Sequence, residues 1–307
     1  AQSAVCATPR AAVAPVGRHN GAVTTIDFVK GHGTQNDFVL VPDESGELDL
    51  TPDQVAYLCH RHAGIGADGV IRVVRTANVP EVAHLAPQAT WFMDYRNADG
   101  SLAEMCGNGT RVFAEYLRSR GLVSGDEGAP FVIATRAGLK EMVAVPHGWA
   151  VDLGQWRLAR AEEAERRGMD SVVQVHGSPD PLPALSLDLG NPHTVVALPP
   201  SVHLSALDLS DAPHIDPHPE QGSNVEFVHA IEHAHIGMRV HERGVGETRS
   251  CGTGTVAAAT AALADASQAL GTVHVHVPGG EVTVEVYDDG TRLTGPSAIV
   301  ATGETSL

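Results

Sequence analysis

Lysine, aromatic residues and basic clusters are scarce in this chain of 307 residues, and each scarcity excludes a class of protein. Lys30 and Lys140 are the only lysines, and aromatic residues make up 4% of the chain. Acidic residues outnumber basic ones by 37 to 20, which gives a formal net charge of −17. Because nucleic acids and anionic membrane surfaces bind basic faces, neither is an expected partner. A small anionic substrate is compatible with this net charge, since a few arginines in a pocket can outweigh the repulsion from distant acidic residues.

Cysteines are also few, and long hydrophobic runs are missing. The four cysteines, at positions 6, 59, 106 and 251, form no CxxC pair and no zinc-finger spacing, so we expect no disulfide scaffold. No apolar run approaches the roughly 18 residues of a membrane span. The opening sequence AQSAVCATPRAAVAPVGRHNG lacks the basic and apolar segments of a signal peptide. We therefore expect a cytoplasmic protein with reduced thiols, in which residues 1–24 form a disordered extension.

The chain does contain enough apolar sequence for two compact units. Hydrophobic residues make up 43%, and the length exceeds that of one average domain. Thr51 and Pro52 predict the start of a helix that ends near His60. The charged stretch 157–170 is interpreted as a solvated linker or an excursion of the chain. Alternating apolar residues predict strands on both sides of a turn near residue 34, a hairpin over 131–145, and further strands at 185–189, 194–198, 224–229, 236–241 and within 272–300.

The most informative pattern is an internal repeat. Residues 106–110 and 251–255 share the pattern CGxGT, and each copy opens an apolar helical sequence. The copies lie nearly half the chain apart, and a polar turn residue, Asn97 or Glu242, precedes each cysteine at the same distance. These matches predict two related halves, each with a cysteine at the start of a helix.

A cysteine at a helix N-terminus faces free backbone N–H groups and the positive end of the helix dipole. Both stabilise a thiolate, so we expect the pKa values of Cys106 and Cys251 to lie below the ordinary value of about 8.5. A thiolate and a thiol on opposite faces of a carbon atom can remove a proton and return one with inversion. Neither lysine lies near these turns, so pyridoxal phosphate is not called for and no cofactor is expected.

Other polar turn residues suggest how an amino acid could be held. Glu242 and Arg243 offer a carboxylate for an ammonium group and a guanidinium for a carboxylate, or form a surface ion pair. His193 could transfer protons or cap a turn. Five asparagines in turns that contain glycine are either ordinary turn residues or amide partners for a zwitterion. They are Asn36, Asn97, Asn108, Asn191 and Asn224.

Paired histidines permit a metal interpretation, because residues two apart on a strand share a face. No cysteine or paired carboxylate accompanies them at a suitable spacing, so we interpret them as a solvated surface and expect no metal. The glycine-rich sequence GIGADG lacks the spacing of a dinucleotide-binding loop. The histidine pairs are His60 and His62, His214 and His218, His233 and His235, and His274 and His276.

Six motifs in their order and spacing resemble the diaminopimelate epimerase family over residues 25–307. They are KGHGTQNDFV, RHAGIGADGV, NADGSLAEMCGNGTR, GNPH, SNVEFV and ERGVGETRSCGTGT. The resemblance implies a cofactor-independent isomerase that interconverts LL- and meso-2,6-diaminopimelate in lysine and peptidoglycan precursor synthesis. It implies a mixed α/β (α+β) fold of two pseudo-symmetric domains, each a curled mixed sheet around a central helix, with the substrate in the cleft between them. The implied domains are 25–145 with 296–307, and 146–295.

The resemblance also implies a role for each candidate residue. Cys106 and Cys251 would be the catalytic thiols, and His193 and Glu242 would assist the proton transfers. The reacting carboxylate would bind backbone donors, at Gly107, Asn108, Gly252 and Thr253. The distal L-centre of the substrate would be held by side chains, those of Asn36, Asn97, Asn191, Asn224 and Arg243. A homodimer is compatible with the resemblance.

Two alternatives stay open on the residues alone. A related cofactor-independent racemase or isomerase of the same fold, acting on another amino acid, would have no use for Arg243 and Asn224. A thiol–disulfide redox protein would use Cys106 and Cys251 with dithiol reductants, and it would introduce no solvent isotope into an amino acid. The sequence does not decide which thiol deprotonates which isomer.

Overall fold

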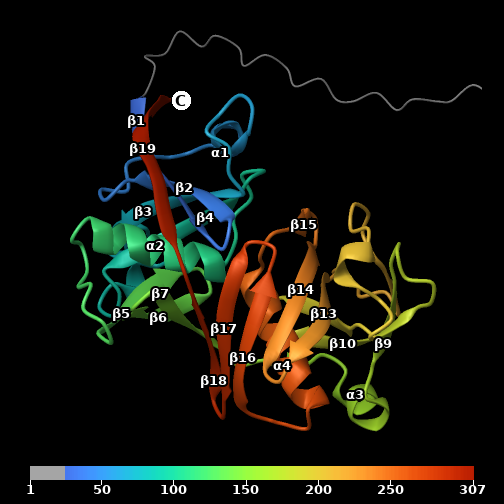
Figure 1. Ribbon diagram of the computed structural model, residues 1–307. Coiled ribbons are helices and arrows are strands. Elements are labelled where there is room, and N and C mark those ends of the chain that lie inside the picture. The colour runs from blue at the N-terminus through green and yellow to red at the C-terminus, as the bar shows by residue number, and fades with distance from the viewer. Residues whose placement is uncertain (1–24) are drawn as a thin grey trace, which may run out of the picture.

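The protein has a mixed α+β fold in which strands predominate, as the sequence predicts. The structure is a computed structural model that describes residues 25–307, so the expected extension at 1–24 lies outside the described residues. Figure 1 shows two lobes of sheet side by side. Each lobe holds one long helix against its strands: α2 (Gly107–Ser119) in the first and α4 (Gly252–Asp265) in the second.

The first half builds its sheet around α2. Strand β2 pairs in parallel with β3, whereas β1 with β2 and β3 with β4 are antiparallel. Strands β5, β6 and β7 follow as an antiparallel meander. The elements of this half are β1 (Thr25–Gly33), β2 (Asn36–Pro42), α1 (Pro52–Cys59), β3 (Gly69–Arg75), the 3₁₀ turns η1 (Thr76–Asn78) and η2 (Ala83–Leu85), β4 (Trp91–Asn97), α2, β5 (Pro130–Thr135), β6 (Gly138–Val145) and β7 (Gly148–Gly154).

The second half repeats this arrangement around α4. Strand β11 pairs in parallel with β13, and β13 pairs antiparallel with β14. The last strand, β19, runs back to pair with β1 (Figure 1). The elements are β8 (Arg157–Leu158), α3 (Ala161–Arg167), β9 (Ser171–Gln174), β10 (Leu182–Asp188), β11 (Pro192–Ala197), η3 (Leu204–Ala206), β12 (His214–Asp216), β13 (Asn224–Glu232), β14 (His235–Glu242), β15 (Gly246–Thr248), α4, β16 (Gly271–Val277), β17 (Gly280–Tyr287), β18 (Gly290–Gly295) and β19 (Ala298–Ser306).

Local sequence explains where α1 begins. The Thr51 hydroxyl accepts the backbone N–H of Gln54, while the Gln54 side chain accepts the N–H of Thr51. This reciprocal capping box satisfies two donors that a helix start leaves free, and Pro52 has no N–H to satisfy. The helix predicted from Thr51 is therefore confirmed.

The interpretation of residues 157–170 as a linker is wrong, because the segment contains strand β8 and helix α3. Glu162 and Glu163 lie in the first turn of α3, and Arg166 and Arg167 lie in the last. Acidic residues near a helix N-terminus and basic residues near its C-terminus both interact favourably with the helix dipole. Gly168 ends the helix in the left-handed conformation, with φ of 70°. The charges that suggested a solvated linker therefore stabilise a short surface helix.

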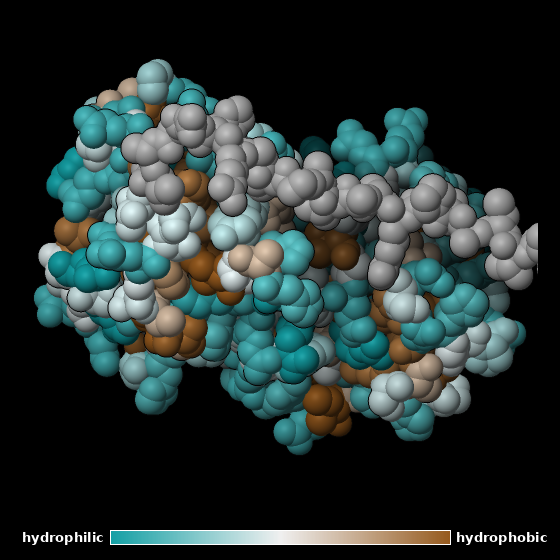
Figure 2. All heavy atoms as spheres, turned by 90° about the horizontal axis from the view of Figure 1, so that it is seen from above, coloured by the Kyte–Doolittle hydropathy of each residue, from teal (hydrophilic) through white to brown (hydrophobic). Residues whose placement is uncertain are grey.

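The face of the molecule that is seen from above in Figure 2 is mainly polar. Figure 2 shows hydrophilic residues over most of the upper face, with smaller apolar areas between them. Within residues 25–307, none of the helices has the length and apolar character needed to cross a bilayer.

Candidate active site

The two CGxGT motifs start helices whose N-termini meet. Cys106 and Cys251 are the N-cap residues of α2 and α4, and both have extended backbone conformations. A Cβ atom placed on Gly252 would lie 3.0 Å from the Cα atom of Gly107. A side chain at Gly252 would therefore crowd the backbone of the other helix start, whereas a Cβ atom on Gly107 would lie 3.5 Å from the Cα atom of Gly252, an ordinary contact. Two sets of free backbone N–H groups converge on one region, which suits an anionic group.

Cys106 lies beside an amide network that joins the two halves. Its thiol donates to Asn36 Oδ1 at 3.6 Å. The same oxygen accepts a hydrogen bond from Asn108 Nδ2 at 3.1 Å, and this amide also donates to the Ser250 carbonyl at 3.0 Å. Asn108 from the first half thus bonds to the residue that precedes Cys251 in the second half.

A carboxylate from the GIGADG motif fixes the orientation of Asn36. Asn36 Nδ2 donates to Asp68 Oδ2 at 2.7 Å, which leaves Oδ1 facing Cys106. Arg61 holds the other oxygen of Asp68 at 2.7 Å. Burial raises the pKa of the Asp68 carboxyl. Asp68 is not among the site residues predicted from the sequence, because inside the glycine-rich sequence GIGADG it offers no signal beyond its polar side chain.

Cys251 ends a different chain of contacts. Its sulfur lies 3.8 Å from Thr253 Oγ1, which accepts a hydrogen bond from Asn191 Nδ2 at 3.3 Å. Asn191 Oδ1 lies 3.1 Å from His193 Nε2, and His193 Nδ1 lies 2.7 Å from Glu226 Oε1. Glu226 is not among the site residues predicted from the sequence. The available signal was a charged residue inside the otherwise apolar strand sequence VEFV.

Glu242 and Arg243 lie at the end of β14. Thr248 donates its hydroxyl hydrogen to Glu242 Oε1. Burial raises the pKa of Glu242 to about 6, against the opposing effect of this hydrogen bond. The Arg243 backbone N–H donates to Asn224 Oδ1 at 2.9 Å, and its guanidinium donates to the Gln221 carbonyl at 2.7 Å. Arg243 and Asn224 are therefore neighbours, whereas the Arg243 guanidinium points toward the loop that precedes β13.

Asn97 occupies the corresponding end of β4 in the first half. It pairs with Gly69 on β3, and its side-chain amide donates to the Ser101 hydroxyl at 3.0 Å. Because Asn36 at the start of β2 and Asn97 at the end of β4 both flank the start of β3, they lie at the same edge of the sheet.

The expectation that both thiols have lowered pKa values is wrong for this arrangement. Burial raises the pKa of Cys106 to about 11, although the backbone N–H groups of Gly109 and Asn108 act in the opposite direction. Burial also raises the pKa of Cys251 well above its usual range, and the negative charges of Glu242 and Glu226 add to this effect. Loss of hydration therefore outweighs the helix N-termini at both sulfurs.

Three of the paired histidines gather on a strand surface of the second half. The ring of His235 stacks on that of His274 at 4.5 Å, and His276 lies 5.8 Å from His235. Glu281 approaches His276 at 3.2 Å. Across residues 25–307, no group of three or more His, Cys, Asp or Glu side chains is placed to hold a metal ion.

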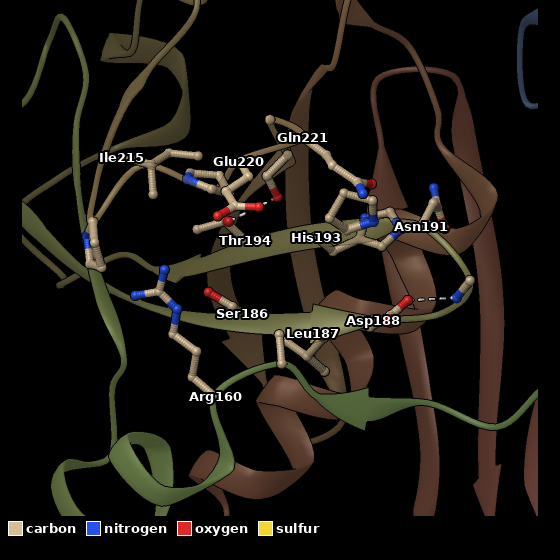
Figure 3. A pocket seen from close by; sticks show the side chains of 17 residues that line it. Arg160, Ser186, Leu187, Asp188, Asn191, His193, Thr194, Ile215, Glu220 and Gln221 are labelled. Atoms are coloured by element: carbon tan, nitrogen blue, oxygen red, sulfur yellow. Dashed lines mark hydrogen bonds between the residues drawn. The ribbon is translucent and has the colours of Figure 1, made fainter.

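A cavity of about 300 Å³ adjoins the second half of the site. Figure 3 shows Asn191 and His193 at one end of this cavity and Arg160 and Ile215 at the other. Its lining includes no thiol, so the cavity flanks the cysteines rather than containing them.

Comparisons with known proteins identify the family of this chain. The sequence profile described as diaminopimelate epimerase matches residues 28–158 and 185–307. A diaminopimelate epimerase from Corynebacterium glutamicum is 51% identical over 296 residues, which cover 92% of this chain and 99% of that protein. Another from Rhodococcus jostii is 48% identical over 292 residues, which cover 91% and 96% of the two chains.

Solved structures show that the fold is shared more widely. A hydroxyproline epimerase from Agrobacterium vitis, with bound trans-4-hydroxy-L-proline, has a TM-score of 0.62 at 14% identity, over 92% of this chain and 91% of that one. A phenazine biosynthesis protein from Bacillus anthracis has a TM-score of 0.61 at 17% identity, over 92% and 99%. At these identities the likeness concerns the fold alone. The profile match and the two relatives near 50% identity show that this chain belongs to the diaminopimelate epimerase family.

Proposed function

We propose that this protein interconverts LL- and meso-2,6-diaminopimelate without a cofactor, in the synthesis of lysine and peptidoglycan precursors. The observation that carries the proposal is the meeting of two helix N-termini, each with a cysteine as its N-cap. Family membership and the relatives named above support the substrate.

In the proposed mechanism, Cys106 and Cys251 act on opposite faces of one α-carbon. One enters the reaction as a thiolate and removes the α-proton, and the other donates its thiol proton from the opposite face. The product is the inverted centre, and the two sulfurs have exchanged protonation states. The backbone N–H groups of the helix starts would donate hydrogen bonds to the substrate carboxylate and stabilise the negative charge that develops on it. These N–H groups belong to Gly107, Asn108, Gly252 and Thr253.

The raised thiol pKa values fit this mechanism when the substrate is considered. Without substrate, burial opposes a thiolate at either cysteine. The α-ammonium group of a bound amino acid brings a positive charge close to both sulfurs, and a nearby opposite charge favours the ionised form. Binding of the correct substrate would therefore help to create the base that attacks it. Glu242, whose pKa is about 6, and His193 would assist these proton movements.

The remaining polar side chains would hold the distal L-centre. Arg243 can present two parallel N–H donors to a carboxylate once its guanidinium turns from Gln221. Asn224 is bonded to the Arg243 backbone and would move with it. The three other side chains proposed for this role are Asn36, Asn97 and Asn191.

Proton NMR in deuterated water tests the proposal directly. With LL-diaminopimelate, we expect the meso isomer to accumulate with deuterium at the inverted α-carbon. A redox protein would instead turn over dithiol reductants and leave the amino acid undeuterated. A racemase for amino acids with one head group would exchange such a substrate as fast as diaminopimelate.

We also propose three features of the whole protein that follow from the family. The proposed division into domains is 25–145 with 296–307, and 146–295. The pairing of β19 with β1 supports the return of 296–307, and the boundary at 145/146 falls between the paired strands β6 and β7. The protein would act in the cytoplasm as a homodimer. Sedimentation equilibrium at low micromolar concentration would yield a dimer mass, and a single monomer mass would contradict this assembly.

A further inference from the structure

A histidine and a glutamate form a buried pair in the second half beside Cys251. The side chains of His193 and Glu226 both have 0% exposure, and Nδ1 lies 2.7 Å from Oε1. An ionised carboxylate only accepts hydrogen bonds, so Nδ1 is the donor when it bonds the carboxylate form of Glu226. Apolar side chains of similar volume are often equally stable at such places, so stability alone does not explain the pair.

The first half has apolar side chains at the equivalent positions. Parallel pairing places Phe38 of β2 opposite the first residue of β3, and His193 of β11 opposite the first residue of β13. Two residues further along β3 and β13, on the same face, lie Ile71 and Glu226. Phe38 and Ile71 are completely buried. The fold therefore accepts an aromatic and an aliphatic side chain at these two positions. The histidine–glutamate pair is a special feature of the second half.

The helix starts confirm that these positions are equivalent. A Cβ atom on Gly109 of α2 would lie 3.3 Å from Ile71 Cδ1. A Cβ atom on Gly254 of α4 would lie 2.6 Å from Glu226 Oε1 and 3.3 Å from the Cys251 sulfur. Ile71 thus packs against the start of α2, whereas a carboxylate packs against the start of α4 beside the thiol.

We propose that Glu226 is a positioning residue for the chemistry at Cys251 and that it acts through His193. This inference rests on the proposed function. The carboxylate holds the ring at Nδ1, which directs Nε2 at the side-chain oxygen of Asn191, an acceptor that bonds Nε2 when this nitrogen carries a proton. Asn191 in turn bonds Thr253, whose hydroxyl lies against the Cys251 sulfur. When Nε2 takes up a proton, the buried carboxylate stabilises the resulting imidazolium.

A pair of variants separates this role from a merely structural one. Glu226→Gln keeps an oxygen that accepts the Nδ1 proton but removes the negative charge. We expect its kcat to fall at least about tenfold, with KM within about twofold of the parent value. In His193→Phe/Glu226→Ile the second half carries the residue pair of the first half, so this variant should fold. Its kcat should equal that of His193→Phe alone, because Glu226 has nothing left to act through.

A measurement without substrate keeps this inference distinct from the proposed function. In ¹⁵N-histidine-labelled protein, His193 should show a protonated Nδ1, and Glu226→Ile should shift the proton of the neutral ring to Nε2, which faces the Asn191 oxygen. This result is expected even if diaminopimelate proves not to be the substrate, whereas an inactive parent enzyme would contradict only the proposed function.

A matched control is Glu115→Gln, which alters a largely buried carboxylate of the first half that accepts Trp149 Nε1 at 3.0 Å. It should leave kcat and the His193 signals unchanged. Three outcomes would overturn the inference: parent-like kcat in Glu226→Gln, further loss when Glu226→Ile is added to His193→Phe, or a His193 tautomer that does not respond to Glu226→Ile.

Discussion

Replacing Gly254 by alanine tests how closely α4 packs on the buried carboxylate. The new Cβ would lie 2.6 Å from Glu226 Oε1, and ordinary contacts begin at 3.4 Å. The oxygen would have to retreat by about 0.8 Å to restore an ordinary contact. Because it is bonded to His193 Nδ1 at 2.7 Å, this retreat must lengthen the bond or turn the ring. We expect kcat for diaminopimelate epimerisation to fall at least about tenfold.

The same substitution should change stability only moderately. Overpacking a tight site costs about 1–3 kcal/mol. Alanine within a helix offsets roughly 1 kcal/mol of this, because glycine loses more backbone entropy. The free energy of unfolding of Gly254→Ala should therefore fall by roughly 0–2 kcal/mol. In a chain of this size such a loss lowers Tm by less than about 8 °C, so the variant remains folded under assay conditions.

The repeat supplies the control for this prediction. At Gly109 the new Cβ would approach Met93 Cε at 2.8 Å, but this atom is the end of a flexible side chain that can move aside. Gly109→Ala should therefore keep nearly all of its activity. The assay combines α-proton exchange followed by NMR with thermal unfolding followed by circular dichroism. Equal activity in the parent and Gly254→Ala, or equal losses in the two variants, would refute the reasoning.

Three further predictions concern residues of the proposed site. Cys106→Ala and Cys251→Ala should each abolish conversion of LL- to meso-diaminopimelate while their circular dichroism stays that of the parent; near-normal turnover in either would rule out a two-thiol mechanism. Arg243→Met should lower kcat and raise KM for diaminopimelate, because one charge-assisted hydrogen bond contributes about 1.5–3 kcal/mol, and the parent should turn over lysine poorly. Unchanged kinetics would exclude the distal carboxylate contact. Burial raises the pKa of Glu242 from 4.5 to about 6, so its neutral form is favoured in the folded state. Relative to Glu242→Gln, the parent should lose about 2 kcal/mol of unfolding free energy as pH rises from below 4.5 through 6, measured by urea unfolding. A difference that does not vary with pH would contradict this burial effect.

Much of the fold and part of the site could be predicted from short stretches of sequence. Thr51 and Pro52 specify the start of α1, because a cap and a proline act within one turn of chain. The CGxGT repeat likewise predicts two helices with cysteines at their starts, which the structure contains. Helix α3 was missed because the same charged residues suit either a solvated linker or a short helix with favourably placed ends.

The electrostatic environment of the site could not be predicted in this way. A helix start favours a thiolate, and this local effect is all that the sequence around Cys106 and Cys251 displays. Burial depends on how residues far apart along the chain pack around the sulfurs, and it reverses the direction of the pKa shift. The position of Glu226 also depends on tertiary contacts, because strand pairing and helix packing bring it between His193 and the start of α4.

The sequence by itself determined which residues can cap, turn and begin helices, since those preferences arise within a few neighbouring residues. It also determined the repeat, and with it the pair of cysteines. Only the tertiary structure decided that the two cysteines have different surroundings, with Ile71 packed under α2 and Glu226 under α4. The physical reason is that desolvation and Coulomb interactions depend on distance in space, and the groups concerned are far apart along the chain.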